Sequence, residues 1–170
     1  MQRMEDMKME LRDLYNSKRI LTGEVIEKGQ DVPSGRYYIT VVVFIENSNG
    51  EFLLQKRVLR KDGRWATTGG HPVSGESSLE GIVTEIKEEL GQSVNQNELT
   101  LFKSIMTEDD FVDLYYMNKD IDINDVVLQE EEVEDAKWAT REEIEQLIEE
   151  DKFSKSHEEF YRYCLEFLEK

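Results

Sequence analysis

Three glutamates near the middle of the chain are spaced so that their carboxylates could act together. Glu88 and Glu89 follow Glu85 by three and four residues, and a helix brings side chains at these spacings onto one face. Like charges held this close repel one another, and more strongly where they are partly buried. A hard divalent cation would remove the repulsion, and Mg²⁺ suits oxygen ligands because it bridges carboxylates to the phosphates of a substrate. Alone, such an acidic stretch is usually a solvated helix face, so the prediction of a metal site depends on what surrounds it.

The segment that carries these glutamates is predicted to be a helix with defined ends. Ser77 and Glu80 have the spacing of a capping box at its start, and Gly91 is a typical stop after its last turn. On this helix the three glutamates lie on a face next to an apolar one. Just before the helix, Gly69 and Gly70 let the backbone turn sharply and approach a ligand, where a carbonyl oxygen could contact a metal ion. The helix and the glycine loop together could hold a cation against a phosphate.

Hydrophobic periodicity predicts an α/β fold, with a mixed β-sheet sandwiched between α-helices. The clearest β signal is a pair of strands at 37–45 and 51–58 around a turn, which predicts a hairpin. The stretch 59–75 is rich in charge and glycine and is expected to be a loop. Further strands are expected at 10–15, 22–26, 99–106, 111–117 and 132–138, and two C-terminal helices at about 141–150 and 154–169. We expect one domain over 1–170, with 1–9 as an irregular lead-in.

Composition bounds the partners of the protein. The chain has 170 residues, 38 of them acidic and 21 basic, and a net charge of -17, which would repel nucleic-acid polymers and anionic membranes. A small phosphorylated substrate is compatible with this charge, because local cations or bound metal ions reverse the field inside a pocket. The N-terminus lacks a secretory signal pattern, and no window is apolar enough to span a membrane, which predicts a cytoplasmic protein. The single cysteine, Cys164, excludes an internal disulfide and is expected to be a buried thiol.

The glycine loop and the helix resemble the Nudix box, the signature of hydrolases that act on nucleoside diphosphates linked to another group. Thr84 stands where that pattern has an arginine, and Gln92 stands where it has an aliphatic residue. The arginine is expected to orient one of the glutamates through a salt bridge, which Thr84 cannot do. This departure bears on the rate, whereas the fold and the metal-binding carboxylates are unaffected. The positions that match the pattern are Gly70, Glu76, Glu85, Ile86, Glu88, Glu89 and Gly91.

The resemblance implies a Nudix fold and a Nudix hydrolase that cleaves the phosphoanhydride bond of a nucleoside diphosphate derivative or another small diphosphate. It implies Mg²⁺, with Mn²⁺ as a substitute, bound by the Gly70 carbonyl and by Glu85, Glu88 and Glu89. The ions would bridge the two phosphates and activate a water molecule for in-line attack. A nucleotide-binding domain that kept the fold but lost turnover stays open as an alternative. A homodimer is expected from the resemblance and from the general frequency of dimers.

Outside the box, the chain resembles the subgroup related to isopentenyl diphosphate isomerase, which makes the isomerase a rival function. That enzyme uses a cysteine where this chain has Gly69, and it gathers its metal with three histidines. Here only His71 has a counterpart, Tyr38 stands at another of the histidine positions, and the glutamates of the box are retained, which favours a hydrolase. The stretches that carry the resemblance are Thr22-Gly23, Leu54-Gln55-Lys56-Arg57, Trp65, Thr68-Gly69-Gly70-His71-Pro72, Glu132-Val133 and Trp138.

The same resemblance assigns the remaining site residues. Arg57 and Lys61 match basic positions that hold the diphosphate, and they belong to a five-residue basic cluster completed by Lys56, Arg60 and Arg64. In so acidic a chain this cluster indicates an anionic ligand. His71 is expected to hydrogen-bond backbone or substrate, and less so to bind metal. The catalytic carboxylates are expected to be Glu85, Glu89 and Glu132. Glu132 is the preferred acceptor of the proton from water, with Glu85 and the neighbouring Glu130 and Glu131 as alternatives.

Overall fold

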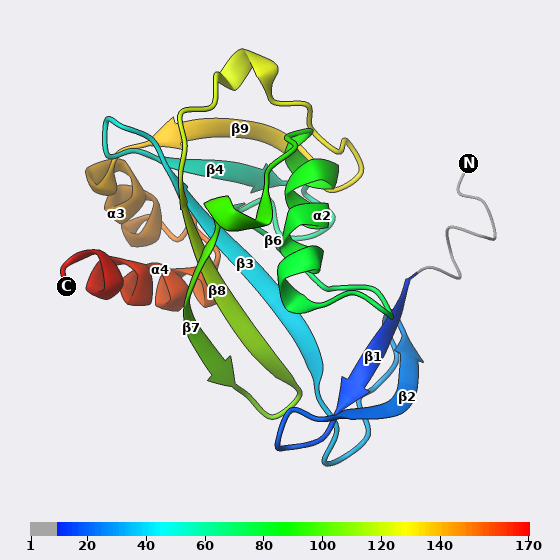
Figure 1. Cartoon of the computed structure of the whole chain (residues 1–170). Coiled ribbons are helices and arrows are strands. Elements are labelled where there is room, and N and C mark those ends of the chain that lie inside the picture. Colours follow the sequence, from blue (N-terminus) through cyan, green and yellow to red (C-terminus); the bar gives the residue numbers. More distant parts are fainter. Residues whose placement is uncertain (1–9) are drawn as a thin grey trace.

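A mixed β-sheet forms the centre of the protein, whose computed structural model describes residues 10–170. β3 (Tyr38–Glu46) lies beside β8 (Asp110–Asn118), and the two strands are parallel (Figure 1). β7 (Thr100–Met106) pairs antiparallel with β8, and β6 (Thr68–Gly70) pairs antiparallel with the other edge of β3. The lead-in expected for residues 1–9 lies outside the described residues.

The predicted hairpin of β3 and β4 (Phe52–Arg57) is confirmed only beside its turn. The two strands pair at one position and then diverge. Each strand has other partners, because β3 pairs with β6 and β8 whereas β4 lies between β5 (Trp65–Ala66) and β9 (Val133–Ala139). Both β5 and β6 fall within 59–75, so the prediction of a loop there is wrong. Strands this short show no alternation of their own, and only their long-range pairing defines them.

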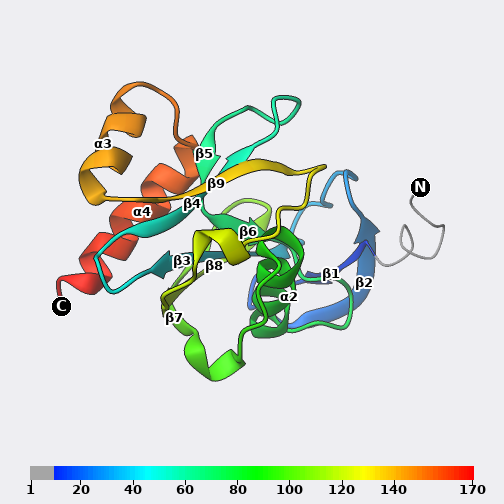
Figure 2. The same cartoon turned by 90° about the horizontal axis from the view of Figure 1, so that it is seen from above.

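Helices cover both faces of the sheet, which confirms the predicted sandwich and the α/β class. α2 (Ser78–Leu90) packs on one face, and α3 (Arg141–Glu149) and α4 (Lys155–Leu168) pack on the other. Figures 1 and 2 show the sheet between α2 on one side and the two C-terminal helices on the other.

The side chains of β3 alternate in direction, so this strand contributes residues to both hydrophobic cores and to a polar cleft. Val41 and Val43 pack in the core under α2, whereas Phe44 packs in the core under α3 and α4. Near the start of the strand, Tyr38 and Thr40 point to the same side as Phe44 but line a cleft. The register of one strand therefore decides which side chains are buried and which reach the cleft.

The helix that carries the glutamates has the predicted ends. Ser77 Oγ accepts a hydrogen bond from the Glu80 backbone at 3.1 Å, and the Glu80 carboxylate accepts one from the Ser77 backbone at 2.9 Å, which completes a capping box. Gly91 ends the helix with a φ of 68°. Two short 3-10 turns that the sequence does not predict follow in the connections, η1 (Gln96–Glu98) and η2 (Ile123–Asp125).

A two-stranded hairpin, β1 (Leu11–Tyr15) and β2 (Leu21–Glu27), precedes the main sheet where strands are predicted. Its turn is fixed to the sheet by Arg19, which donates two hydrogen bonds to Asp113 of β8 at 2.8 and 2.5 Å. A charge-assisted pair of this forked geometry is stronger than a hydrogen bond between neutral groups. The hairpin is therefore attached to the domain through its turn as well as through its strands.

Asp113 is fully buried but has a partner for each oxygen. The hydroxyls of Ser78 and Ser104 donate to it at 2.5 and 2.7 Å, in addition to Arg19. Burial alone would raise the pKa of Asp113, but these hydrogen bonds together lower it below its ordinary value. The charged form is the stable one in the folded protein.

None of the helices among the described residues is long and apolar enough to cross a membrane. Cys164 is buried in α4, as the sequence predicts, and burial raises the pKa of its thiol to about 12. A thiol with so high a pKa is not a nucleophile at neutral pH.

Replacing Arg19 by alanine is expected to lower the free energy of unfolding by about 3 kcal/mol, because it leaves the buried Asp113 charge without its cation. Urea unfolding measures this. Arg36→Ala is the matched control, since Arg36 forms an exposed pair with Glu24, and such pairs contribute about 0–1 kcal/mol. Equal losses in the two variants would show that the Asp113 network does not anchor the hairpin.

Candidate active site

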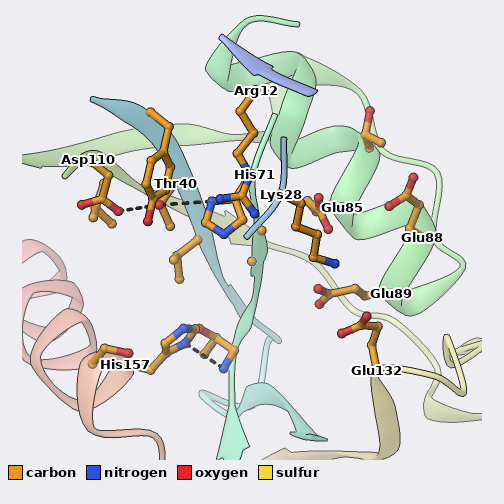
Figure 3. A pocket seen from close by; sticks show the side chains of 18 of the residues that line it. Arg12, Lys28, Thr40, His71, Glu85, Glu88, Glu89, Asp110, Glu132 and His157 are labelled. Carbon is orange, nitrogen blue, oxygen red and sulfur yellow. Dashed lines mark hydrogen bonds between the residues drawn. The ribbon is translucent and has the colours of Figure 1, made fainter. Parts of the chain in front are cut away.

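A cleft of about 900 Å³ opens between α2, the sheet and the beginning of α4, and its size is typical of a small-molecule site. Figure 3 shows side chains from these separate elements gathered around it. The eight residues that the sequence assigns first to catalysis, substrate or metal all line this cleft, although their roles stay predictions. These residues are Arg57, Lys61, Gly70, His71, Glu85, Glu88, Glu89 and Glu132.

Glu85 lies against Gly70, at the point where β6 passes α2. A Cβ atom on Gly70 would stand 2.5 and 2.6 Å from the two carboxylate oxygens of Glu85, so a larger residue would force this carboxylate out of its position. Burial, followed by the charges of Glu89 and Glu88, raises the pKa of Glu85 to about 8. Without a cation nearby, the charged form of Glu85 is therefore disfavoured.

Glu89 is buried on the side of α2 that faces β4, with 8% of its surface exposed. Gln55 of β4 donates a hydrogen bond to its carboxylate at 2.6 Å, and Gln55 is itself held because it accepts one from the Thr68 hydroxyl at 2.9 Å. Burial raises the pKa of Glu89 to about 7, although the hydrogen bonds from Gln55 and Gly69 act in the opposite direction. A chain of polar contacts thus fixes this carboxylate at the wall of the cleft.

The three carboxylates share the cleft without meeting at one point. Glu88 is exposed, Glu89 turns toward Gln55, and Glu85 lies against Gly70. Across residues 10–170, no three His, Cys, Asp or Glu side chains are gathered closely enough to hold a metal ion. The predicted convergence of the three carboxylates on one point is therefore incomplete.

The donor set nevertheless fits a hard divalent cation. Glu85 and Glu89 are carboxylates whose charge is destabilised by burial, Glu88 adds a third, and Gly70 brings a backbone carbonyl to the same wall. Mg²⁺ accepts such oxygen ligands and completes its coordination with water. A cation here would relieve the electrostatic penalty that the three carboxylates carry.

Arg57 and Lys61 line the cleft and already have partners. Arg57 donates to Asp62 at 3.0 Å and lies 3.3 Å from Nε2 of His157. Lys61 forms an ion pair with Glu132. Two residues that the sequence predicts for separate tasks, phosphate binding and proton transfer, are therefore in direct contact.

The rest of the basic cluster does not reach the cleft. Lys56 and Arg64 form ion pairs with other surface residues, and Arg60 donates to a backbone carbonyl. None of the three lines the cleft, so within the cluster only Arg57 and Lys61, the two residues that the resemblance assigns to the diphosphate, border it. Strand alternation explains Lys56, because Gln55 and Arg57 on either side of it both point into the cleft.

The NUDIX domain family model matches residues 36–164, which run from just before β3 into α4. The chain belongs to the Nudix family. An uncharacterized Nudix hydrolase of Listeria monocytogenes is 35% identical over 144 residues, which cover 82% of this chain and 85% of that protein. The nucleoside triphosphatase NudI of an Enterobacter species is 32% identical over 124 residues, which cover 64% of this chain and 86% of that protein.

Solved structures show the same fold. The crystal structure of DR0079 from Deinococcus radiodurans superposes with a TM-score of 0.71 at 20% identity, and the match covers 86% of this chain and 93% of that one. The expected Nudix fold and the expected class of enzyme, a Nudix hydrolase, are confirmed.

Thr84 replaces the arginine of the Nudix box, yet it still contacts a glutamate of the box. Its hydroxyl donates to one carboxylate oxygen of Glu76 at 2.7 Å, and the other oxygen accepts from the Val73 backbone at 2.9 Å. No salt bridge forms, as expected, but a hydrogen bond takes its place. Glu76 therefore ties the glycine loop to α2, which keeps Gly70 beside Glu85.

His71 follows the glycine loop and contacts the sheet, in line with the expectation that it hydrogen-bonds backbone. Its Nδ1 lies 3.4 Å from the Ile39 carbonyl and 3.3 Å from the Thr40 hydroxyl, which itself donates to Asp110 at 2.6 Å. Both oxygens can accept, so Nδ1 carries the proton. Burial, followed by the charge of Arg12, lowers the pKa of His71 to about 4. The ring is therefore neutral at physiological pH.

Several residues that line the cleft are given no role by the sequence. Gln55 lies in a stretch that carries the resemblance, directly after three apolar residues of β4, and buried amides need partners. His157 occupies a buried position of α4, where its Nδ1 accepts from the Thr67 backbone at 3.2 Å, and burial lowers its pKa to about 3. The remaining members belong to strands or loops distant in sequence. The set is Arg12, Lys28, Thr40, Gln55, Asp110 and His157.

Replacing Thr84 by valine keeps the shape but removes the donor to Glu76. Hydrogen bonds to charged groups contribute about 1.5–3 kcal/mol, so we expect the free energy of unfolding to fall by about 1.5 kcal/mol. The turnover rate should fall too, since the glycine loop loses its attachment to α2. Thr84→Ser keeps the hydroxyl and should behave like the natural protein in urea unfolding and in activity assays. If serine and valine are equally impaired, the hydroxyl is not what matters at this position.

Proposed function

We propose that this Nudix protein is a Mg²⁺-dependent hydrolase of the phosphoanhydride bond in a nucleoside diphosphate derivative or another small diphosphate, with Mn²⁺ as a substitute. The observation that carries the proposal is one cleft lined by the half-buried carboxylate of Glu85, the buried carboxylate of Glu89 and the cations Arg57 and Lys61. Buried carboxylates suit a hard divalent cation, and basic side chains suit phosphate oxygens. A diphosphate bound with Mg²⁺ satisfies both sets of charges.

The relatives support a small nucleotide as the substrate. One relative is named a nucleoside triphosphatase and another a Nudix hydrolase. The net charge of -17 opposes nucleic-acid polymers and anionic membranes, because their phosphates would be repelled over most of the surface. The basic residues Arg12, Lys28, Arg57 and Lys61 line the cleft, where a small phosphorylated ligand can reach them.

The proposed metal ligands are Glu85, Glu88, Glu89 and the Gly70 carbonyl. When bound, Mg²⁺ would supply withdrawal of charge from phosphorus and a more acidic water molecule. The chain itself fixes the ligands, because Gln55 holds Glu89 and the absence of a side chain at Gly70 leaves room for Glu85.

The remaining proposed roles belong to the basic wall and to the loop before β9. Arg57 and Lys61 would neutralise the non-bridging phosphate oxygens as charge builds up during the reaction. His71, a neutral ring beside the glycine loop, would contact the substrate through its unprotonated nitrogen. Glu132 would accept the proton of the attacking water. Of the acidic run 130–132, only Glu132 lines the cleft, which supports it over its two neighbours.

The geometry around β6 speaks against the isomerase. A Cβ atom at Gly69 would lie 2.7 Å from the Val41 carbonyl, so a cysteine at this position would require the backbone of β3 to shift. His71 hydrogen-bonds the sheet, and no second histidine stands beside it, since His157 lies at the far end of the cleft in Figure 3. We propose that the chain is related to the isomerase subgroup but does not catalyse the isomerisation.

The wider expectations also stay proposals. The N-terminal hairpin packs on the main sheet through Arg19 and Asp113, which supports a single domain over 1–170. A homodimer and a cytoplasmic location stay predictions. The exposed Leu101 and Met106 on the edge strand β7 are apolar side chains that a dimer could cover, and analytical ultracentrifugation tests this.

Removal of divalent cations should abolish hydrolysis of nucleoside diphosphates, triphosphates and sugar nucleotides, measured as the nucleoside monophosphate formed, and Mg²⁺ or Mn²⁺ should restore it. Glu89→Gln should lower turnover by at least about 100-fold, since even the loss of an outer-sphere support costs 10–100-fold. Saturating Mg²⁺ should raise the Tm of the natural protein by about 5–10 °C, because binding at a hundred times Kd stabilises by about 2.7 kcal/mol.

The control for this test is Glu142→Gln, which neutralises an exposed glutamate of α3 and should change neither activity nor the Mg²⁺ effect on Tm. Mg²⁺-dependent nucleotide binding with no turnover of any substrate would replace the hydrolase by a binding domain. If Mg²⁺ leaves the Tm unchanged, the proposal of a metal site is wrong.

Glu132→Gln should lower kcat by about 100- to 10,000-fold, the range that general-base catalysis contributes, with a smaller effect on KM. Glu131→Gln is the matched control, because Glu131 is adjacent in sequence but exposed and outside the cleft. Steady-state kinetics with the best substrate of the panel measures both. A larger loss in the control variant would assign the proton acceptor elsewhere in this run.

A further inference from the structure

The N-terminal hairpin lies outside the residues that the family model matches, yet it borders the cleft. The match begins at residue 36, whereas Arg12 of β1 and Lys28, which follows β2, both line the cleft. Figure 3 shows both side chains on the same cleft as the carboxylates of α2. The cleft therefore contains two cations that the family-matched residues do not supply.

β1 is fixed to the loop of the Nudix box on both sides of Arg12. The Ser74 backbone donates to the Leu11 carbonyl at 2.6 Å. The Asp13 carboxylate accepts from the Ser74 hydroxyl at 2.6 Å and from the Gly75 backbone at 2.9 Å. Successive side chains of a strand point to opposite faces, so Asp13 turns toward the loop and Arg12 toward the cleft. The position of Arg12 is thus set by the same loop that carries Gly70.

Arg12 is half-buried and packs over the ring of Tyr38, with its guanidinium carbon 5.1 Å from the ring centroid. Among residues 10–170 it has no hydrogen-bond or ion-pair partner, although a guanidinium has five N–H donors. Burial lowers the pKa of Arg12, whereas the charges of Glu10 and Glu85 act in the opposite direction. Partly buried donors without partners are unfavourable, and an anion in the cleft would satisfy them.

Arg12 and Arg57 serve different ends of the cleft. Arg57 contacts Asp62 and His157, and Figure 3 places His157 at the opposite end of the view from Arg12. Lys28 lines the same cleft, and Figure 3 shows it at a height between Arg12 and His157. A ligand that spans these cations must carry negative charge over more than one short segment.

On the basis of the hydrolase function proposed above, we propose that Arg12, assisted by Lys28, binds a phosphate beyond the scissile diphosphate, so that the preferred substrates are nucleoside triphosphates. A diphosphate esterified at both ends carries about two negative charges, which one divalent cation balances, whereas a nucleoside triphosphate carries about four. Arg57 and Lys61 already have the acidic partners Asp62 and Glu132. Two additional cations without partners in the described part of the chain suit a substrate with a further phosphate, and arginine is the residue that binds phosphate oxygens in pairs.

The test compares a nucleoside triphosphate with a nucleoside diphosphate sugar of the same base, in the full-length protein with Mg²⁺. Arg12→Gln should raise KM for the triphosphate by about 10- to 100-fold, equivalent to the 1.5–3 kcal/mol of hydrogen bonds to a charged group. KM for the diphosphate sugar should stay within about 2-fold, as for a substitution remote from the ligand. Lys28→Gln should show the same selectivity with a smaller effect, and Arg12→Lys should restore part of the affinity.

Arg36→Gln is the matched control, because Arg36 pairs with Glu24 at the surface and does not line the cleft. Calorimetry with a triphosphate analogue that carries a methylene bridge gives a readout that does not depend on turnover, and Arg12→Gln should weaken its Kd by the same factor. An equal loss on both substrates, or no loss on either, overturns the proposal. Hydrolysis of diphosphate sugars without binding of the triphosphate analogue would also overturn it and leave the hydrolase intact. Absence of all turnover would overturn the proposed function, while the calorimetry would still decide the role of Arg12.

Discussion

Glu85 and Glu89 lie on one helix with carboxylates that burial and neighbouring charge make hard to ionise. The other contacts of the site hold these two carboxylates in place. The capping box at Ser77 sets where α2 begins and hence the register of both glutamates. Gly70 passes so close to Glu85 that any side chain on it would collide, and Gln55 reaches from another strand to hold Glu89. Each contact confines a charge that is unstable alone, which is the condition under which a cation binds tightly.

The sheet brings these pieces together because β3 and β4 separate after their turn. A regular hairpin would keep the two strands paired, and β6 could not then occupy the edge of β3. Their divergence lets β6 join the sheet beside β3 and bring Gly69 and Gly70 to α2. Alternate residues of β3 and β4, including Thr40, Gln55 and Arg57, face the space that opens. The cleft is thus a direct result of which strands pair, and strand alternation supplies its polar lining.

Local pattern was enough to predict what depends on neighbours in sequence. The capping box, the register of the three glutamates and most strand positions follow from spacings of a few residues. What could not be predicted depends on contacts between distant segments. The two short strands β5 and β6 have no periodicity, and nothing near Thr84 indicates that its hydroxyl reaches Glu76. The pairing of Lys61 with Glu132, and the entry of Arg12 into the cleft, likewise require the three-dimensional arrangement. The same holds for the basic cluster, because adjacency in sequence does not reveal that Arg57 and Lys61 line the cleft whereas Lys56, Arg60 and Arg64 do not.

The pKa values of two buried carboxylates, Asp113 and Glu89, are shifted in opposite directions. The difference distinguishes a structural carboxylate from one that is available for catalysis. Asp113 is completely buried, but Arg19, Ser78 and Ser104 satisfy its oxygens and lower its pKa. Glu89 is nearly as buried, yet its one side-chain hydrogen-bond donor, Gln55, is neutral, and its pKa is raised to about 7. The protein therefore balances the charge of Asp113 with its own side chains, whereas the charge of Glu89 is left to be balanced by a bound ion. A carboxylate with a strongly shifted pKa in a cleft indicates a functional position. Arg19 pairs with Asp113, which lies outside the cleft, whereas Glu89, which lines it, forms no such pair with any arginine that the structure describes.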